Sequence, residues 1–175
     1  GKTYSGVGTL SCIGERVTLR AGAHVYGGVR IGNDTTIGHH TLIRSFVQVG
    51  ENTQIAHGLT IERETKIGSY VRCSPLSHIT SSVVIEDRVF LGAGIMTIND
   101  KGMIWKEEER KPELLPPYFE HGAKVGSGST ILAGVRIGRE ALIGSGSVVT
   151  RDIPPFAIAY GSPAKVRGYT NQQNH

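Results

Sequence analysis

The sequence has few cysteines, few aromatic residues and no long apolar run. With only Cys12 and Cys73 among 175 residues, a disulfide framework is excluded. No apolar run approaches the roughly 20 residues that span a membrane. The 19 Lys and Arg residues are scattered and not interleaved with aromatic residues, which argues against nucleic-acid binding. We therefore expect a cytoplasmic protein without a signal peptide and without membrane or nucleic-acid partners.

What the sequence has instead is an aliphatic residue at every sixth position. From Val7 to Leu91, fourteen of fifteen such positions are aliphatic, and the fifteenth is Cys73, which also favours burial. The rhythm returns in a new phase at Val125, Ile131, Ile137, Ile143 and Val149. A period of six fits neither an α-helix nor an alternating strand. It is typical of a parallel β-helix.

A small or β-branched residue stands two positions before most of these aliphatic residues. These positions hold Thr35, Thr41, Val47, Thr53, Thr65, Val71, Ser77, Val83, Val89, Ser129, Val135, Ala141 and Ser147, with Leu59 as an outlier. Because side chains two apart on a strand share a face, we expect both positions to point inward. Glycine often follows the aliphatic residue, and Asn or Asp occupies some corners. We expect these residue types there because they tolerate unusual backbone angles.

Three hexapeptides would close one triangular turn of eighteen residues, so about twenty repeats predict six to seven turns. With roughly 4.8 Å between stacked strands, the prism would be about 30 Å long. The general rule for parallel crossovers predicts a right-handed coil.

The rhythm stops after Thr97 and returns at Phe119. The stretch between them, 98–118, is charged and contains the only Trp of the chain. Because polar residues such as Asn99 stand at its root, we predict a flap that covers a site or reaches a neighbouring subunit. A solvated excursion is the alternative.

The interruption divides a single domain into four parts. These parts are β-helix turns over 1–97, an extended loop over 98–118, further turns over 119–153, and a C-terminal tail over 154–175.

Five histidines fall in repeats that we assign to one stacked face: His24, His39, His40, His57 and His78. His39 and His57 are eighteen residues apart, so they should lie one strand spacing from each other. Three roles stay open: polar residues in a subunit interface, a general base with His78 nearest the loop root, or a zinc site. Zinc needs at least three ligands and only two of these histidines stack in adjacent turns, so another subunit or another corner would have to supply the third, and we predict no metal site.

Two segments resemble the hexapeptide-repeat acyltransferases. The run from Gly134 to Ala157, followed by Tyr160-Gly-Ser-Pro-Ala-Lys-Val-Arg-Gly, resembles the coenzyme A-binding end of that superfamily. The run Ile85-Glu-Asp-Arg-Val-Phe-Leu-Gly, followed by Thr97-Ile-Asn-Asp, resembles the branch that N-acylates amino sugars carried on nucleotides. The resemblance implies a left-handed β-helix, a homotrimer with active sites between neighbouring prisms, acetyl-CoA or another acyl-CoA as co-substrate, and a nucleotide-linked amino sugar as acceptor. The net charge of +4 would suit such anionic ligands.

The resemblance also implies a coenzyme site of six residues: Ser127, Ser145, Thr150, Arg151, Lys165 and Arg167. The backbone at the two serines would contact the acyl and pantetheine region. Thr150 and Arg151 would contact the coenzyme further out, and Lys165 and Arg167 would contact its phosphates. An ordinary solvated basic tail is the alternative for the last two.

On the acceptor side, the resemblance and the loop root together point to His78, Asn99 and Asp100. An uncharged amine would attack the thioester carbonyl while backbone N–H groups stabilise the oxyanion. His78 or Asp100 would accept the proton, and Asn99 would position the acceptor. Some members of this branch need no protein base, because the departing thiolate accepts the proton.

The chain departs from the family pattern at two places. Residues 98–118 contain no histidine, whereas the O-acetyltransferases carry a catalytic one there, which argues against O-acetylation. Ser74-Pro75-Leu76 stand where the nucleotide-sugar branch often has amides, so the acceptor sugar stays open. The alternatives are a γ-carbonic-anhydrase-type zinc enzyme with histidines between subunits and a non-catalytic hexapeptide-repeat subunit.

Overall fold

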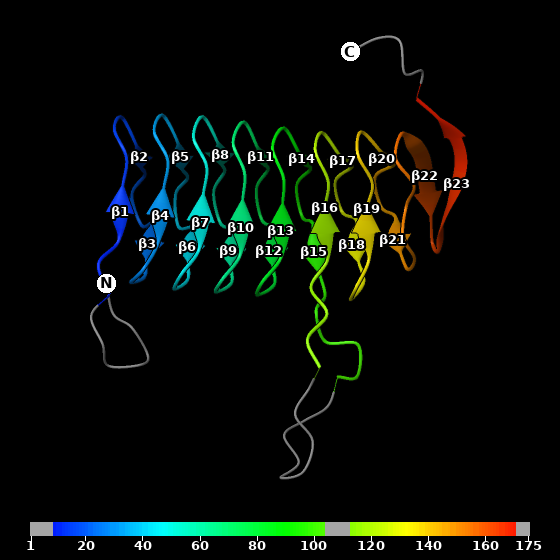
Figure 1. The fold of residues 1–175 in the computed structure, drawn as a ribbon, viewed down its shortest axis with the longest axis horizontal. Coiled ribbons are helices and arrows are strands. Elements are labelled where there is room, and N and C mark those ends of the chain that lie inside the picture. The colour runs from blue at the N-terminus through cyan, green and yellow to red at the C-terminus, as the bar shows by residue number, and fades with distance from the viewer. Residues whose placement is uncertain (1–8, 104–112, 171–175) are drawn as a thin grey trace.

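The computed structural model describes residues 9–103 and 113–170, and within them all strands belong to three sheets that form the faces of a prism (Figure 1). Sheet A stacks β1 (Cys12–Ile13), β4 (Arg30–Ile31), β7 (Gln48–Val49), β10 (Lys66–Ile67), β13 (Val84–Ile85), β16 (Tyr118–Phe119) and β19 (Arg136–Ile137). Sheet B stacks β2 (Thr18–Leu19), β5 (Thr36–Ile37), β8 (Gln54–Ile55), β11 (Arg72–Cys73), β14 (Phe90–Leu91), β17 (Lys124–Val125), β20 (Leu142–Ile143), β22 (Ala157–Gly161) and β23 (Ala164–Tyr169). Sheet C stacks β3 (His24–Val25), β6 (Leu42–Ile43), β9 (Thr60–Ile61), β12 (His78–Ile79), β15 (Met96–Thr97), β18 (Thr130–Ile131) and β21 (Val148–Val149).

The coil is left-handed. In Figure 1 the strands of sheet A run upward on the near side, and those of sheet B run downward on the far side, while successive turns advance from left to right. Each sheet contributes one two-residue strand to each of seven turns of the described chain, and β22 adds an eighth strand to the stack in sheet B. The predicted left-handed β-helix is confirmed, with part of one more turn than expected.

The predicted inward positions form the core. From Ile31 onward, the aliphatic residues of the rhythm are at most 4% exposed, and the residues two positions before them are buried as well. The buried hydroxyls bond to the neighbouring turn: Thr35 Oγ1 donates to the Gly50 carbonyl (2.8 Å), and Thr41 Oγ1 donates to the Ala56 carbonyl (2.7 Å). Within the described residues no buried side-chain polar atom lacks a partner. Threonine is therefore tolerated in the core, because the next turn always presents a carbonyl.

The first turn is the exception to this burial. Ile13 is 45% exposed and Leu19 is 48% exposed, although both hold inward positions of the rhythm. An inward side chain is covered only when a turn packs on each side of it, and no described turn precedes this one. The first position of the rhythm, Val7, lies outside the described residues.

The glycines that follow the aliphatic residues have a different cause from the predicted one. A Cβ on Gly32 would lie 2.6 Å from the Glu51 nitrogen, and one on Gly126 would lie 2.5 Å from the Ser145 nitrogen. These positions need glycine because neighbouring turns approach closely. The positive φ falls two residues later, where Asn52 (53°) and Leu76 (60°) adopt it without being glycine.

The loop leaves sheet C after β15 and returns to sheet A at β16, so it replaces one corner of the prism. At its root Asp100 forms an antiparallel bridge with Leu114, and the Leu115 N–H donates to the Asn99 carbonyl (2.7 Å). The central part, 104–112, which includes Trp105, lies outside the described residues.

The segment predicted as a C-terminal tail extends sheet B. β22 pairs in parallel with β20, and β23 folds back antiparallel on β22. The described residues contain no helix that is long and apolar enough to cross a membrane.

Candidate active site

Sheet C gathers most of the predicted site residues. His78 lies in β12, Asn99 and Asp100 follow β15, Ser127 and Ser145 lie in the turns that lead into β18 and β21, and Thr150 and Arg151 follow β21. Seven of the nine predicted residues therefore lie on this face or at its borders, although 73 residues of sequence separate the first from the last.

His78 lies on the outer surface of sheet C beside the strand that enters the loop. It pairs with Met96 of β15, and its side chain is 39% exposed. His78 Nε2 lies 3.8 Å from Glu62 Oε1, and Glu62 Oε2 accepts a hydrogen bond from Arg44 Nη1 (2.7 Å). The Glu62 carboxylate is thus held by the Arg44 guanidinium near the imidazole, too far for a hydrogen bond but close enough to stabilise the protonated ring, while the His78 side chain stays accessible.

The loop starts where the core rhythm reverses. Ile95 fills the position that elsewhere holds Thr, Ser, Ala, Val or, once, Leu59, and Thr97 fills the aliphatic position; both are 0% exposed. Thr97 Oγ1 accepts a hydrogen bond from the Thr80 N–H (2.8 Å), so a side chain replaces the usual backbone acceptor. Pairing with β12 ends at Met96, whereas pairing with β18 continues through Thr97, and the Ile98 N–H donates to the Ile131 carbonyl (2.9 Å). The backbone leaves the prism after this bond.

Asn99 and Asp100 hold the root of the loop. Asn99 Nδ2 donates to Ser81 Oγ (2.8 Å), and Asp100 Oδ1 accepts from the N–H groups of Gly102 and Met103 (both 2.9 Å). Asn99 Oδ1 and Asp100 Oδ2 have no hydrogen-bond partner among the described residues. Asp100 also lines a hollow of about 260 Å³ with Lys101 and other loop residues. Each side chain therefore keeps one oxygen for a ligand after fixing the backbone.

The turns that carry the two serines form a bare edge. Ser127 and Ser145 are exposed and lie in neighbouring turns, since the Gly146 N–H donates to the Ser127 carbonyl (2.8 Å). Ser127 Oγ accepts from the Ala93 N–H (3.1 Å), which gives this side chain a structural bond as well. A Cβ on Gly128 or Gly146 would meet nothing within 4 Å. A narrow, extended ligand could lie along this edge against the backbone.

Lys165 and Arg167 do not join the other residues on sheet C. Both lie exposed on β23, at the end of sheet B. Lys165 pairs with Tyr160, and the Arg167 guanidinium lies 5.7 Å from the centre of the Tyr160 ring. Their contact with coenzyme phosphates stays a prediction.

The assignment of five histidines to one face is wrong. His24 and His78 lie in strands of sheet C, whereas His39, His40 and His57 lie in the turns between sheets B and C. The reason is that each repeat contains a turn, so a residue five positions after the aliphatic one already belongs to the next face. His39 and His57 do lie in neighbouring turns, because the Gly58 N–H donates to the His39 carbonyl (2.8 Å).

The sequence reasoning missed a hollow beside those turns, which we call the corner hollow. It has a volume of about 420 Å³ and lies between the outer surface of sheet B and the turns toward sheet C. Its polar lining consists mainly of Arg20, Thr36, His39, Gln54, His57 and Arg72. These residues come from four turns, and the signal that could have found them is the eighteen-residue register that pairs Gln54 with Arg72.

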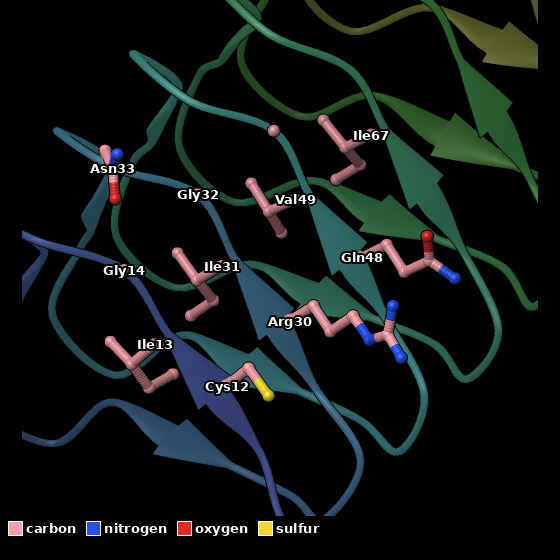
Figure 2. Close-up of a pocket in the computed structure, with 11 residues that line it drawn as sticks. Cys12, Ile13, Gly14, Arg30, Ile31, Gly32, Asn33, Gln48, Val49 and Ile67 are labelled. Carbon is pink, nitrogen blue, oxygen red and sulfur yellow. The ribbon is translucent and has the colours of Figure 1, made fainter.

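A second surface groove lies along sheet A and holds none of the predicted site residues. Its volume is about 470 Å³. Figure 2 shows Cys12, Arg30 and Gln48 in one row and the aliphatic residues that follow them in a second row. Of the described residues that line it, Arg30 alone is charged, so the groove offers little polar chemistry.

A polar cluster on sheet A fixes the strand to which the loop returns. The Tyr118 hydroxyl donates to Glu86 Oε1 (2.5 Å), and this bond together with burial raises the pKa of Tyr118. Glu86 Oε2 accepts from the His121 N–H (2.7 Å), and the Arg136 guanidinium lies 4.2 Å from the centre of the Tyr118 ring.

In residues 9–103 and 113–170, no group of three His, Cys, Asp or Glu residues could hold a metal ion.

Parts of the sequence are similar to known proteins. Residues 13–45 and 117–151 match the bacterial transferase hexapeptide family (six repeats). Over 51 residues the chain is 57% identical to dTDP-3-amino-3,6-dideoxy-alpha-D-galactopyranose 3-N-acetyltransferase from Aneurinibacillus thermoaerophilus. This match covers 29% of the present chain and only 27% of the relative.

Solved structures share the fold over most of the chain. AntD, an N-acyltransferase from Bacillus cereus crystallised with dTDP and coenzyme A, has a TM-score of 0.62 at 16% identity, covering 97% of this chain and 88% of AntD. LpxA, a UDP-N-acetylglucosamine acyltransferase from Bacteroides fragilis 9343, has a TM-score of 0.69 at 21% identity, covering 91% of this chain and 70% of LpxA. At these identities the likeness concerns the fold.

Proposed function

We propose that this hexapeptide-repeat protein, whose repeats are those of the bacterial transferases, is an acyl-CoA-dependent N-acyltransferase. Its acceptor is a small amino sugar carried on a nucleotide, and the acyl group is acetyl. The observation that carries the proposal is that seven residues predicted for two different substrates lie on sheet C or at its borders. The name of the relative that is 57% identical over 51 residues, a dTDP-amino-sugar N-acetyltransferase, supports the same chemistry.

The reaction transfers the acyl group directly between two bound substrates. The uncharged amine attacks the thioester carbonyl, the new C–N bond forms, and the C–S bond breaks with release of coenzyme A. The alignment of the two substrates supplies much of the acceleration. Exposed backbone N–H groups near the attacked carbonyl stabilise the oxyanion as it develops.

The acceptor side is formed by His78, Asn99 and Asp100. His78, whose protonated form Glu62 at 3.8 Å would stabilise, takes the proton that the amine loses. The free oxygens of Asn99 and Asp100 accept hydrogen bonds from the amine or from sugar hydroxyls. Because the loop-root contacts fix both side chains, these oxygens are held in place before the acceptor binds.

The donor side is formed by the late turns of the prism. The pantetheine arm lies along the bare edge at Ser127 and Ser145, where small side chains leave the backbone open. Thr150 and Arg151, both exposed after β21, contact the coenzyme further out. Lys165 and Arg167 bind its phosphates, which requires the coenzyme to reach around the end of the coil to β23.

The active assembly is a cytoplasmic homotrimer in which the sheet C site of each prism faces a neighbouring copy. Sedimentation or mass photometry of the purified protein measures this directly. A monomer that retains full activity would contradict the shared site.

The decisive experiment incubates the purified protein with acetyl-CoA and a panel of nucleotide-linked amino sugars, and it follows the release of free thiol. Each amine is paired with the analogue that carries a hydroxyl at the same carbon, and we expect turnover only with an amine. Release of thiol with the hydroxyl analogues would favour O-acylation. No release with any acceptor, together with no binding of coenzyme A, would contradict the proposal.

A further inference from the structure

The corner hollow combines positive charge with a lack of acidic groups. Arg20 and Arg72 line it, together with the imidazoles of His39 and His57 and the amide of Gln54. No Asp or Glu is among the described residues that line it. A surface of this composition attracts anions, because a guanidinium offers several N–H donors in a planar fork.

The two arginines of the corner hollow are not neutralised within the described chain. Elsewhere, Arg16 bonds to Asp34 (2.6 Å) and Arg44 bonds to Glu62 (2.7 Å). Arg72 lies 5.7 Å from the centre of the Phe90 ring, and no carboxylate of the described residues pairs with it or with Arg20. Both guanidinium groups are therefore available to a ligand.

The arrangement suits an extended anion better than a single phosphate. Arg20 follows a strand of the first turn and Arg72 lies in a strand of the fourth, so their backbones are three strand spacings apart, roughly 14 Å. The two arginines thus approach the hollow from opposite ends, with His39 and Gln54 between them. A volume of about 420 Å³ exceeds what a phosphate fills and falls within the range of ligand sites for nucleotides and similar molecules.

The corner hollow lies on the same edge of the prism as the predicted donor site. His39 and His57 occupy the turns between sheets B and C, and Ser127 and Ser145 occupy the same turns further along. Three turns separate His57 from Ser127, which is roughly 14 Å. A ligand in the hollow could therefore extend a sugar amine toward the acyl group.

We propose that the corner hollow binds the nucleoside diphosphate part of the acceptor, with Arg20 and Arg72 pairing with the phosphates. Gln54 and the two histidines, which line the hollow together with the arginines, contact the same ligand. This inference rests on the proposed function, because it takes the acceptor to be nucleotide-linked.

The test measures binding of UDP and of dTDP by calorimetry at low salt. The variant Arg20→Gln/Arg72→Gln removes both cations from the corner hollow, and Arg30→Gln/Arg63→Gln removes two exposed arginines elsewhere, so both proteins carry the same net charge. We expect the first variant to bind each nucleotide at least thirtyfold more weakly than the wild type, and the second to stay within twofold. Equal melting temperatures and equal binding of coenzyme A show that the fold and the donor site are intact.

Several outcomes would overturn the inference. One is binding of UDP and dTDP by Arg20→Gln/Arg72→Gln at the wild-type affinity. Another is binding of inorganic pyrophosphate as tight as that of UDP and dTDP, which would show that the nucleoside makes no contact in the corner hollow. If the wild type binds neither nucleotide but still transfers acetyl to a free amino sugar, the inference fails and acyl transfer stands. If nucleotide binding depends on the two arginines but no amine is acylated, the corner hollow stands and the proposed function fails.

Discussion

The turns between sheets B and C have the same backbone along the whole prism but two different surfaces. In the early turns the left-handed position alternates between glycine (Gly22, Gly58) and a larger residue, His40 (φ 55°) or Leu76 (φ 60°), whereas the later turns hold only glycine, at Gly94, Gly128 and Gly146. A non-glycine residue in this conformation costs roughly 1–2 kcal/mol. The coil geometry therefore permits either choice. The side chains at this position differ with the surface around them, which is a polar hollow in the early turns and a bare edge in the late turns.

The largest effect we expect comes from the position that neighbouring turns crowd. Gly126→Val would place its Cβ about 2.5 Å from the Ser145 nitrogen, and we expect a loss of about 3 kcal/mol or more in the free energy of unfolding. Urea denaturation measures this loss. Gly128→Ala is the control: its Cβ meets nothing within 4 Å, so we expect only the conformational cost of about 1 kcal/mol. Equal losses in the two variants would show that contact between turns does not explain the glycines.

A second change makes the late edge resemble the early one. Gly128→Leu copies the residue that Leu76 provides in the same backbone position, so the fold should tolerate it. The new side chain would cover the edge at Ser127, and we expect the affinity for coenzyme A to fall roughly a hundredfold, about 2.7 kcal/mol. The converse variant, Leu76→Gly, should leave that affinity unchanged. Unchanged binding by Gly128→Leu would place the pantetheine arm elsewhere.

The loop root lies beside the late turns and should affect catalysis rather than folding. We expect Asn99→Ala and Asp100→Ala each to lower turnover at least tenfold, a loss of about 1.4 kcal/mol in transition-state stabilisation. The trimer should persist, because the core repeats lie elsewhere. Thiol release at saturating acetyl-CoA and gel filtration measure the two effects. Full activity in both variants would remove these residues from the site.

His78 should have a smaller effect than the loop root. The departing thiolate can accept the proton that the amine loses, so we expect His78→Asn to lower kcat less than tenfold, under about 1.4 kcal/mol. Glu62→Gln removes the carboxylate that would stabilise the protonated imidazole, and it should reproduce part of the same loss. A drop of a thousandfold in kcat would instead make His78 the essential base.

The smallest effect concerns the contrast between outward and inward positions of the repeat. Cys12 is exposed, whereas burial raises the pKa of Cys73 to about 12. At pH 8 one thiol per chain should react rapidly with a disulfide reagent, and the second should react only after denaturation. The unfolded chain loses the Cys73 proton more easily than the folded chain, because burial raises the pKa in the folded state. The free energy of unfolding should therefore fall as the pH rises from about 9 toward 12. Two fast thiols in the native protein would contradict the burial of Cys73.

The parts of the site that depend only on the repeat pattern could be predicted from the sequence. The stacking of the Ser127 turn on the Ser145 turn follows from counting repeats, because residues eighteen apart occupy the same position in neighbouring turns. The face of a single residue also depends on where the turn falls within its repeat, which is why the histidines were assigned wrongly. The loop could be located because the six-residue rhythm stops after Thr97 and returns only at Phe119. The corner hollow could not be found in this way, since Arg20 and Arg72 lie on different turns and their convergence depends on where two long side chains point.

Residue order alone determined the prism, its core positions and the place where the loop leaves, because a six-residue period records directly which side chains are removed from water. Contacts between residues eighteen or more apart decided the rest. They require glycine after the aliphatic residue, they divide the histidines between a face and a corner, and they extend sheet B into the last segment. These features depend on the distance between neighbouring turns, which exists only after the coil has closed.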